Sequence, residues 1–217
     1  DYVSRMKEDQ TEIFYLTGES RTVVENSPHL EAFREKEIEV LYLVDPVDEL
    51  LVQSLNEYGG KKLKSIGKGT VKLGTEEEKK KAEAELEEKE KDLKPLLELL
   101  QKKLDENVKQ VRLTNRLTTS PACLVGAEHD YSPQLEKLLQ KGKGGGTKQR
   151  RILELNPNHA LLSKLHEVFE KNAEDDRLGD YAELLFGYGL LAEGSEIPDA
   201  PKFNRAMADL MTRGLEG

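Results

Sequence analysis

The stretch of sequence that decides the fold is RRILELNPNHALLSKLHEVF, residues 150–169. Its apolar run from Ile152 to Leu155 is typical of a strand, and the run stops at Asn156 and Pro157. Apolar residues then recur at helical spacing through the rest of the stretch. We expect Asn156 to cap this helix, because its side chain can accept a hydrogen bond from the first turn and proline suits the next position. The stretch contains no evident nucleophile, metal cluster or phosphate loop, so it favours an architectural or binding role.

The composition excludes several classes of function. The net charge of -9 argues against a nucleic-acid-binding protein, because phosphate binding needs clustered Lys and Arg. The single cysteine, Cys123, excludes an intramolecular disulfide and suits a reducing compartment, and the sequence has no apolar run of membrane-spanning length. We therefore expect a cytoplasmic protein that binds neither nucleic acid nor membrane. The first residue is Asp1, and we expect the chain to be a fragment of a longer protein.

The first part of the chain alternates predicted strands and helices. Strands are predicted at residues 12–17 and 38–44, and the second is so apolar that we expect it to be buried on both faces of a parallel sheet. Helices are predicted after Ser20, from Pro28, and over residues 46–58. Residues 59–74 are rich in Gly and Lys, which predicts a loop with at most one edge strand. The pattern indicates a small α/β layer.

The second part of the chain is predicted to be an α+β unit. Residues 75–92 form a highly charged, exposed connecting helix, and Pro95 is expected to interrupt it, because proline cannot donate the helical hydrogen bond. We therefore predict two domains, residues 1–92 and 93–217. Strands near 108–113 and 122–125 join the one at 152–155 in a three-stranded sheet. Two amphipathic helices end the chain. The predicted fold is thus mixed, a small α/β domain followed by an α+β domain with a C-terminal helical bundle.

The candidate chemical groups favour no enzyme. The Gly-rich residues 142–146 lack the Gly-Lys-Ser/Thr ending of a phosphate-binding loop, so a surface linker is expected. Cys123 could be a nucleophile paired with His129, but its apolar neighbours favour a buried, inert thiol. His159 and His166 are seven residues apart, whereas metal ligands on one helix are normally three or four apart. We expect no catalytic residue and no metal site.

The apolar faces of two regions are larger than a small sheet can cover. The last two helices could pair with a second copy in a four-helix bundle, or could pack wholly within their own domain. The helix after Ser132 carries apolar residues on one side, and it could bind non-native segments or could belong to the core. The pattern leaves both alternatives open.

Four blocks of sequence resemble one known family. They read YVSRMKEDQTEIFYLTGES (2–20), NSPHLEAFREKEIEVLYLVDPVDELLVQSL (26–55), VKQVRLTNRLTTSPACLV (108–125) and LELNPNHALLSKL (153–165). Together they resemble the bacterial form of the 90-kDa heat-shock protein chaperones, collinearly over nearly the whole chain.

The resemblance implies the role of each part. Residues 1–92 would be the end of the middle domain, and 93–217 the C-terminal dimerisation domain, of a chaperone whose ATPase domain precedes this fragment. The chain alone would then be no enzyme and would need no cofactor, with ATP and Mg²⁺ acting only in the full-length protein. Its partners would be a second copy, non-native client proteins and other bacterial chaperones. The alternative is a helical scaffold protein without chaperone activity, which would need a sustained heptad that residues 75–92 lack.

The resemblance also implies two sets of site residues. The client-binding set is expected to be Glu49, Leu50, Gln53, Tyr131, Leu135, Leu138 and Leu139. The dimer interface is expected to consist of Leu184, Leu185, Tyr188, Leu191, Phe203, Met207, Leu210 and Met211.

Overall fold

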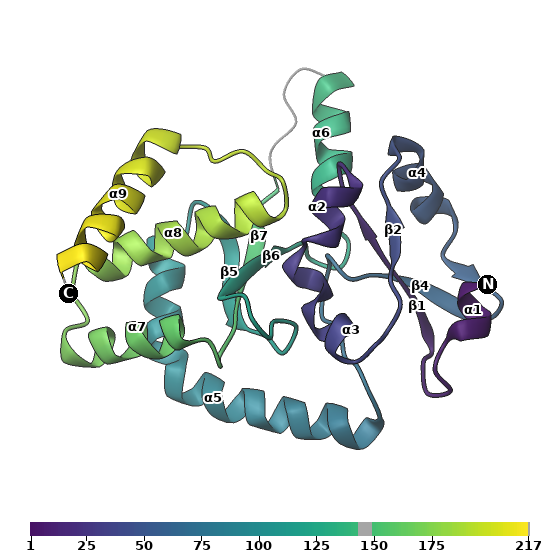
Figure 1. Ribbon diagram of the computed structural model, residues 1–217, viewed down its shortest axis with the longest axis horizontal. Helices are drawn as coiled ribbons and strands as arrows, with labels where there is room; N and C mark the ends of the chain where they lie inside the picture. Colours follow the sequence, from purple (N-terminus) through teal and green to yellow (C-terminus); the bar gives the residue numbers. More distant parts are fainter. Residues whose placement is uncertain (143–148, 217) are drawn as a thin grey trace.

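Two β-sheets, each with its own apolar core, organise the molecule (Figure 1). The computed structural model describes residues 1–142 and 149–216. The elements before the long helix are α1 (Tyr2–Arg5), β1 (Glu12–Thr17), α2 (Arg21–Glu25), η1 (Pro28–Leu30), α3 (Glu31–Glu35), β2 (Leu41–Leu43), α4 (Pro46–Ser54), β3 (Glu57–Tyr58) and β4 (Lys61–Ser65). The others are α5 (Glu76–Lys103), β5 (Val108–Leu113), β6 (Ala122–Val125), α6 (Pro133–Gly142), β7 (Arg151–Leu155), α7 (Ala160–Lys171), α8 (Arg177–Ala192) and α9 (Ala200–Glu216). The expected mixture of helices and strands is confirmed.

The first sheet has the strand order β2-β1-β4-β3, with β1 parallel to both β2 and β4. The strand predicted at residues 12–17 is confirmed with the same bounds. The prediction that residues 38–44 form a strand buried on both faces was wrong, because only β2 is extended there and it lies half-buried at the sheet edge. Conversely, β4 lies inside the sheet. The lysines of this segment led to the prediction of a loop. Two of them have partners that make the strand position possible, since Lys61 donates to the carbonyl of Gln10 and Lys64 pairs with Glu128.

The second sheet has the order β5-β7-β6, with β7 parallel to β5 and antiparallel to β6. The strands predicted at residues 108–113 and 122–125 have the predicted bounds, and every residue of β7 is buried. Helix α8 packs on β6 so closely that a Cβ on Gly189 would lie 2.8 Å from Cγ of Leu124. Glycine at this position lets α8 approach the sheet.

Helix α5 is continuous through Pro95, so the prediction that proline would end the helix there was wrong. Figure 1 shows α5 running along the bottom of the molecule and then turning up beside the second sheet. A proline inside a helix costs roughly 3 kcal/mol. Burial of the four leucines around it offsets that cost, since each fully buried leucine contributes about 1.5–3 kcal/mol. They are Leu93, Leu96, Leu97 and Leu100.

The cap of α7 differs from the sequence-based expectation. The helix begins at Ala160, and Nδ1 of His159 accepts the capping hydrogen bond from the Leu161 N–H at 3.1 Å. Asn156 lies three residues earlier and is 1% exposed. Its side chain donates to the carbonyl of Ser120 at 3.1 Å and accepts from the N–H of Asn158 at 2.9 Å. Asn156 therefore holds the turn between β7 and α7 against a neighbouring loop instead of capping the helix.

Polar contacts join the two sheets into one body. The Glu31 carboxylate of α3 accepts hydrogen bonds from the N–H groups of Thr118, Thr119 and Ser120, at 2.7–3.1 Å. The guanidinium of Arg116 donates to the carbonyls of Ile66 and Gly69, which follow β4. In each case a side chain of one half pairs with backbone groups of the other half, so these bonds fix the two sheets relative to each other.

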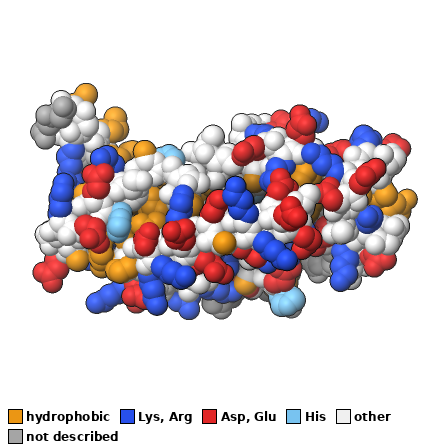
Figure 2. Space-filling model, turned by 90° about the horizontal axis from the view of Figure 1, so that it is seen from below, with side chains coloured by type: hydrophobic (Ala, Val, Ile, Leu, Met, Phe, Trp, Pro, Cys, Tyr) orange, Lys and Arg blue, Asp and Glu red, His pale blue; other side chains and the backbone are white. Residues whose placement is uncertain are grey.

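The surface carries mixed charge. On the face seen in Figure 2, Lys and Arg side chains are interspersed with Asp and Glu. Within residues 1–142 and 149–216, no helix has the length and apolar content that crossing a membrane requires.

Candidate functional site

Exposed apolar side chains gather on α4 and α6, which contact each other although about 80 residues separate them in the chain. Figure 1 shows α6 projecting from the body of the molecule at the end where α4 also lies. We name this region the α4–α6 surface. Its exposed residues are Val47, Leu50, Leu51, Tyr131, Leu138 and Leu139. Exposed apolar side chains this close together are typical of a binding surface.

A buried hydrogen bond holds α4 against the start of α6. The Ser132 hydroxyl donates to Oε1 of Glu49 at 2.6 Å and accepts from the N–H of Leu135 at 3.0 Å, so it also caps α6. At the start of α4, the backbone N–H of Asp45 donates to the Asp48 carboxylate at 2.9 Å. The two helices are therefore oriented by polar contacts at their bases, and their apolar side chains remain exposed.

Ion pairs fix the base of α6 to the rest of the protein. Arg151 of β7 donates to Glu136 at 2.7 Å, and both residues are buried. Lys137 donates to the Glu19 carboxylate and to the carbonyl of Gly194, each at 2.9 Å. The helix thus has a rigid base, whereas Leu138 and Leu139 lie beyond these contacts.

The structure separates the expected client-binding residues into two groups. Leu50, Gln53, Tyr131, Leu138 and Leu139 are exposed on the α4–α6 surface. By contrast, Glu49 is 2% exposed and Leu135 6% exposed, so neither side chain is available there. Glu49 positions α6, and Leu135 belongs to the core. Two further exposed residues, Val47 and Leu51, were not predicted, although Val47 lies at helical spacing from both Leu50 and Leu51.

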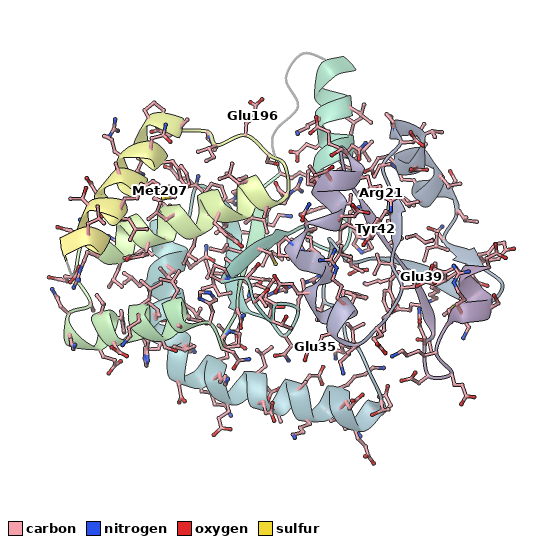
Figure 3. The ribbon with its side chains drawn as sticks, in the orientation of Figure 1. Arg21, Glu35, Glu39, Tyr42, Glu196 and Met207 are labelled. Carbon is pink, nitrogen blue, oxygen red and sulfur yellow. The ribbon has the colours of Figure 1, made fainter. Side chains whose placement is uncertain are left out.

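A second apolar surface lies on the last two helices. Helices α8 and α9 contact each other, and Gly187 faces the ring of Phe203 so closely that a Cβ there would lie 2.3 Å from Cε2 of the ring. Met207, labelled in Figure 3, lies on α9. We name the exposed side chains of this pair the α8–α9 surface, which consists of Tyr188, Leu191, Met207, Met211 and Leu215.

The expected dimer-interface residues also separate by exposure. Tyr188, Leu191, Met207 and Met211 belong to the α8–α9 surface, and Phe203 and Leu210 of α9 are half-buried. Leu184 and Leu185, however, are 8% and 3% exposed. Because their side chains are already buried within this chain, they are not available to a partner. Leu215 was missed, although it lies four residues after Met211.

The candidate chemical groups do not assemble into an active site. Cys123 is 1% exposed, and burial raises the pKa of its thiol well above the ordinary value, as expected for a protonated, unreactive group. His159 caps α7, and Nε2 of His166 lies 3.5 Å from the Glu170 carboxylate on the helix surface. The described part of the chain holds no group of three His, Cys, Asp or Glu side chains that could bind a metal ion. The candidate phosphate loop at 142–146 lies outside the described residues, apart from Gly142.

Comparison with known proteins decides the family. The family model described as "Hsp90 protein" matches residues 1–217. The chain belongs to the Hsp90 family. It is 52% identical over 215 residues to the chaperone protein HtpG of Frankia casuarinae, covering 99% of this chain and 33% of that protein. It is 51% identical to HtpG of Rhodococcus jostii, covering 98% and 33%, and 49% identical to HtpG of Geobacter metallireducens, covering 97% and 32%. The chain therefore spans about a third of the length of these relatives.

The family match corrects one sequence-based prediction. The chain was expected to be no enzyme, whereas the Hsp90 family is a family of ATPase chaperones and its model matches the chain from end to end. The classification as a non-enzyme is replaced by membership of an ATPase family.

Two arginines of the second half share one buried carboxylate. Arg112 and Arg116 could neutralise phosphate, but both pair with the buried Glu154. Neither guanidinium is therefore free of a partner.

Proposed function

We propose that this chain is the part of an Hsp90-type chaperone that binds non-native client proteins, and that it does so through the α4–α6 surface. The observation that carries the proposal is the group of exposed leucine, valine and tyrosine side chains on two helices held at a fixed angle by the Glu49–Ser132 hydrogen bond. Non-native proteins expose apolar segments, and an exposed apolar surface on rigid elements binds such segments by removing both from water.

We further propose that residues 1–92 and 93–217 act as the end of the middle domain and as the dimerisation domain of the family. The two separate apolar cores support this division, since one is built from residues 14–66 and the other from residues 93–190. Two copies paired through their α8–α9 surfaces would present two α4–α6 surfaces to one client. Once one surface has bound, the second binds at a raised effective concentration.

Removing apolar side chains from the α4–α6 surface should weaken client binding without unfolding the protein. We expect the triple variant Leu50→Ser, Leu138→Ser, Leu139→Ser to bind a permanently unfolded protein at least tenfold more weakly, since each leucine buried on binding contributes about 1.5–3 kcal/mol. The melting temperature should stay close to that of the wild type, because these side chains are exposed at 61%, 38% and 47%. Fluorescence anisotropy of a labelled, reduced and alkylated client measures the binding.

Tyr58→Ser is the matched control. Tyr58 is 64% exposed on β3, outside the α4–α6 surface, so its loss should leave client affinity unchanged. Unchanged affinity of the triple variant, or an equal loss in the control, would show that clients do not bind through this surface.

A further inference from the structure

A cavity of about 230 Å³ opens beside the α4–α6 surface, between the first sheet and the base of α6. Four of its lining residues are exposed, namely Glu19, Pro46, Tyr131 and Leu138. Two of these, Tyr131 and Leu138, belong to the α4–α6 surface itself. A chain segment lying on that surface would therefore pass over the cavity.

The walls of the cavity are apolar over much of their area. They include Leu16, Val24, Val44, Leu124 and Ala192, which come from both halves of the molecule. The volume is below the roughly 300–1,000 Å³ of sites that enclose drug-sized ligands. The cavity thus suits a single large side chain better than a complete small-molecule ligand.

Two of the residues that line this cavity each carry a buried hydrogen-bond acceptor without a donor. Among the described residues, two buried side-chain polar atoms have no hydrogen-bond partner, Nδ1 of His29 and Oε1 of Gln134, and both residues line the cavity. Buried polar atoms are satisfied in the great majority of cases, so two orphans in one cavity point to a donor that the chain does not supply.

The protonation state of His29 makes its free nitrogen an acceptor. Burial, followed by the nearby Arg116 charge, lowers the pKa of His29 to about 3, so the ring is neutral at physiological pH. The ring is also hydrogen-bonded to the backbone of Leu124. A neutral imidazole with one nitrogen used as donor has an acceptor at the other.

We propose that this cavity is a pocket for one aromatic client side chain that carries a polar hydrogen, tyrosine or tryptophan, whose O–H or N–H is accepted by Gln134. The inference rests on the proposed client-binding function. Gln134 lies one helical turn before Leu138 on the same face of α6, and both residues line the cavity. The apolar walls enclose the ring, and His29 supplies a second acceptor in the same cavity. A phenylalanine ring fits the walls but leaves the acceptors unpaired, which is unfavourable for buried polar groups.

Two peptides that differ by one oxygen atom test the pocket. They are fluorescein-labelled nine-residue peptides, identical except for tyrosine or phenylalanine at the central position, and their dissociation constants for the 217-residue chain are measured by anisotropy. We expect the tyrosine peptide to bind about tenfold more tightly, because the phenylalanine peptide buries the acceptors without a donor. Equal affinities would overturn the pocket inference and leave the proposed function intact. Failure of both peptides to bind would contradict the proposed function itself.

Replacing the acceptor should remove the preference for tyrosine. Gln134→Leu keeps the size of the side chain, and we expect the tyrosine-to-phenylalanine affinity ratio to fall from about tenfold to near one. The matched control is Gln110→Leu, since Gln110 is exposed on β5 and does not line the cavity, and it should keep the tenfold ratio. Melting curves verify that both variants fold. A ratio that persists in Gln134→Leu, or that falls equally in Gln110→Leu, would overturn the assignment.

Discussion

Glu154→Gln is expected to destabilise the protein by about 3–5 kcal/mol, measured as the free energy of unfolding in urea. Glu154 is 2% exposed and accepts hydrogen bonds from two arginines, from Arg112 at 2.6 Å and from Arg116 at 2.9 Å. Arg116 in turn donates to backbone carbonyls of the first half. Removing the carboxylate charge leaves two guanidinium groups close together with no anion between them, and it weakens the contact that joins the two sheets.

Glu167→Gln is the control for the same chemical change. Glu167 pairs with Lys164 at 2.8 Å on the surface of α7, where solvent screens the pair. The control should unfold at the same urea concentration as the wild type. If Glu154→Gln also unfolded there, the Arg112–Glu154–Arg116 cluster would contribute no net stability.

The stability that Glu154 provides should depend on pH. Burial alone raises the pKa of this carboxyl, but Arg116 and Arg112 outweigh burial and lower it below the ordinary value. A group with a lowered pKa in the folded state stabilises fully above its unfolded pKa, roughly 4.3, and loses that contribution as the pH falls through the folded value. The stability difference between wild type and Glu154→Gln should therefore be constant near pH 7 and should shrink in acid. A difference that grew as the pH fell below 4 would contradict the assigned direction.

Local signals in the sequence were enough to place most strands and helices. The strands at 12–17, 108–113 and 122–125 have the predicted bounds, because apolar residues between turn-forming residues indicate strands directly. Pro95 and Asn156 were misjudged for a common reason. Each is a strong local signal, for a helix end and for a helix cap, and in each case tertiary contacts outweighed it.

The candidate surfaces could be predicted only in part. Helical spacing identifies an apolar face, but it does not tell which side chains of that face the same chain already covers. Leu185 packs in the core of the second half, whereas Leu191, six residues later on α8, is 57% exposed. Glu49 shows the opposite limit. The resemblance implied that it binds clients, whereas its side chain is buried and bonded to Ser132, 83 positions away in the chain.

Two charges placed on the α8–α9 surface should convert a dimer of this chain into monomers. Leu191 and Met211 are 57% and 64% exposed, so Leu191→Glu with Met211→Glu should not disturb the core. In a dimer paired through this surface, both carboxylates would be buried without partners. Interface anchors of this kind cost 2 kcal/mol or more each when lost, so we expect the dissociation constant to rise by at least about 100-fold. Sedimentation equilibrium over a range of concentrations measures it.

Arg205→Glu provides a control with the same change in net charge. Replacing one arginine by glutamate alters the charge by two units, as the double variant does, but Arg205 lies outside the α8–α9 surface. The control should therefore keep the dimer, which separates loss of a specific contact from general repulsion between acidic chains. A double variant that stayed dimeric would exclude this surface as the interface. A wild-type chain that was monomeric at high micromolar concentration would exclude dimerisation through these helices, and with it the bivalent binding of clients.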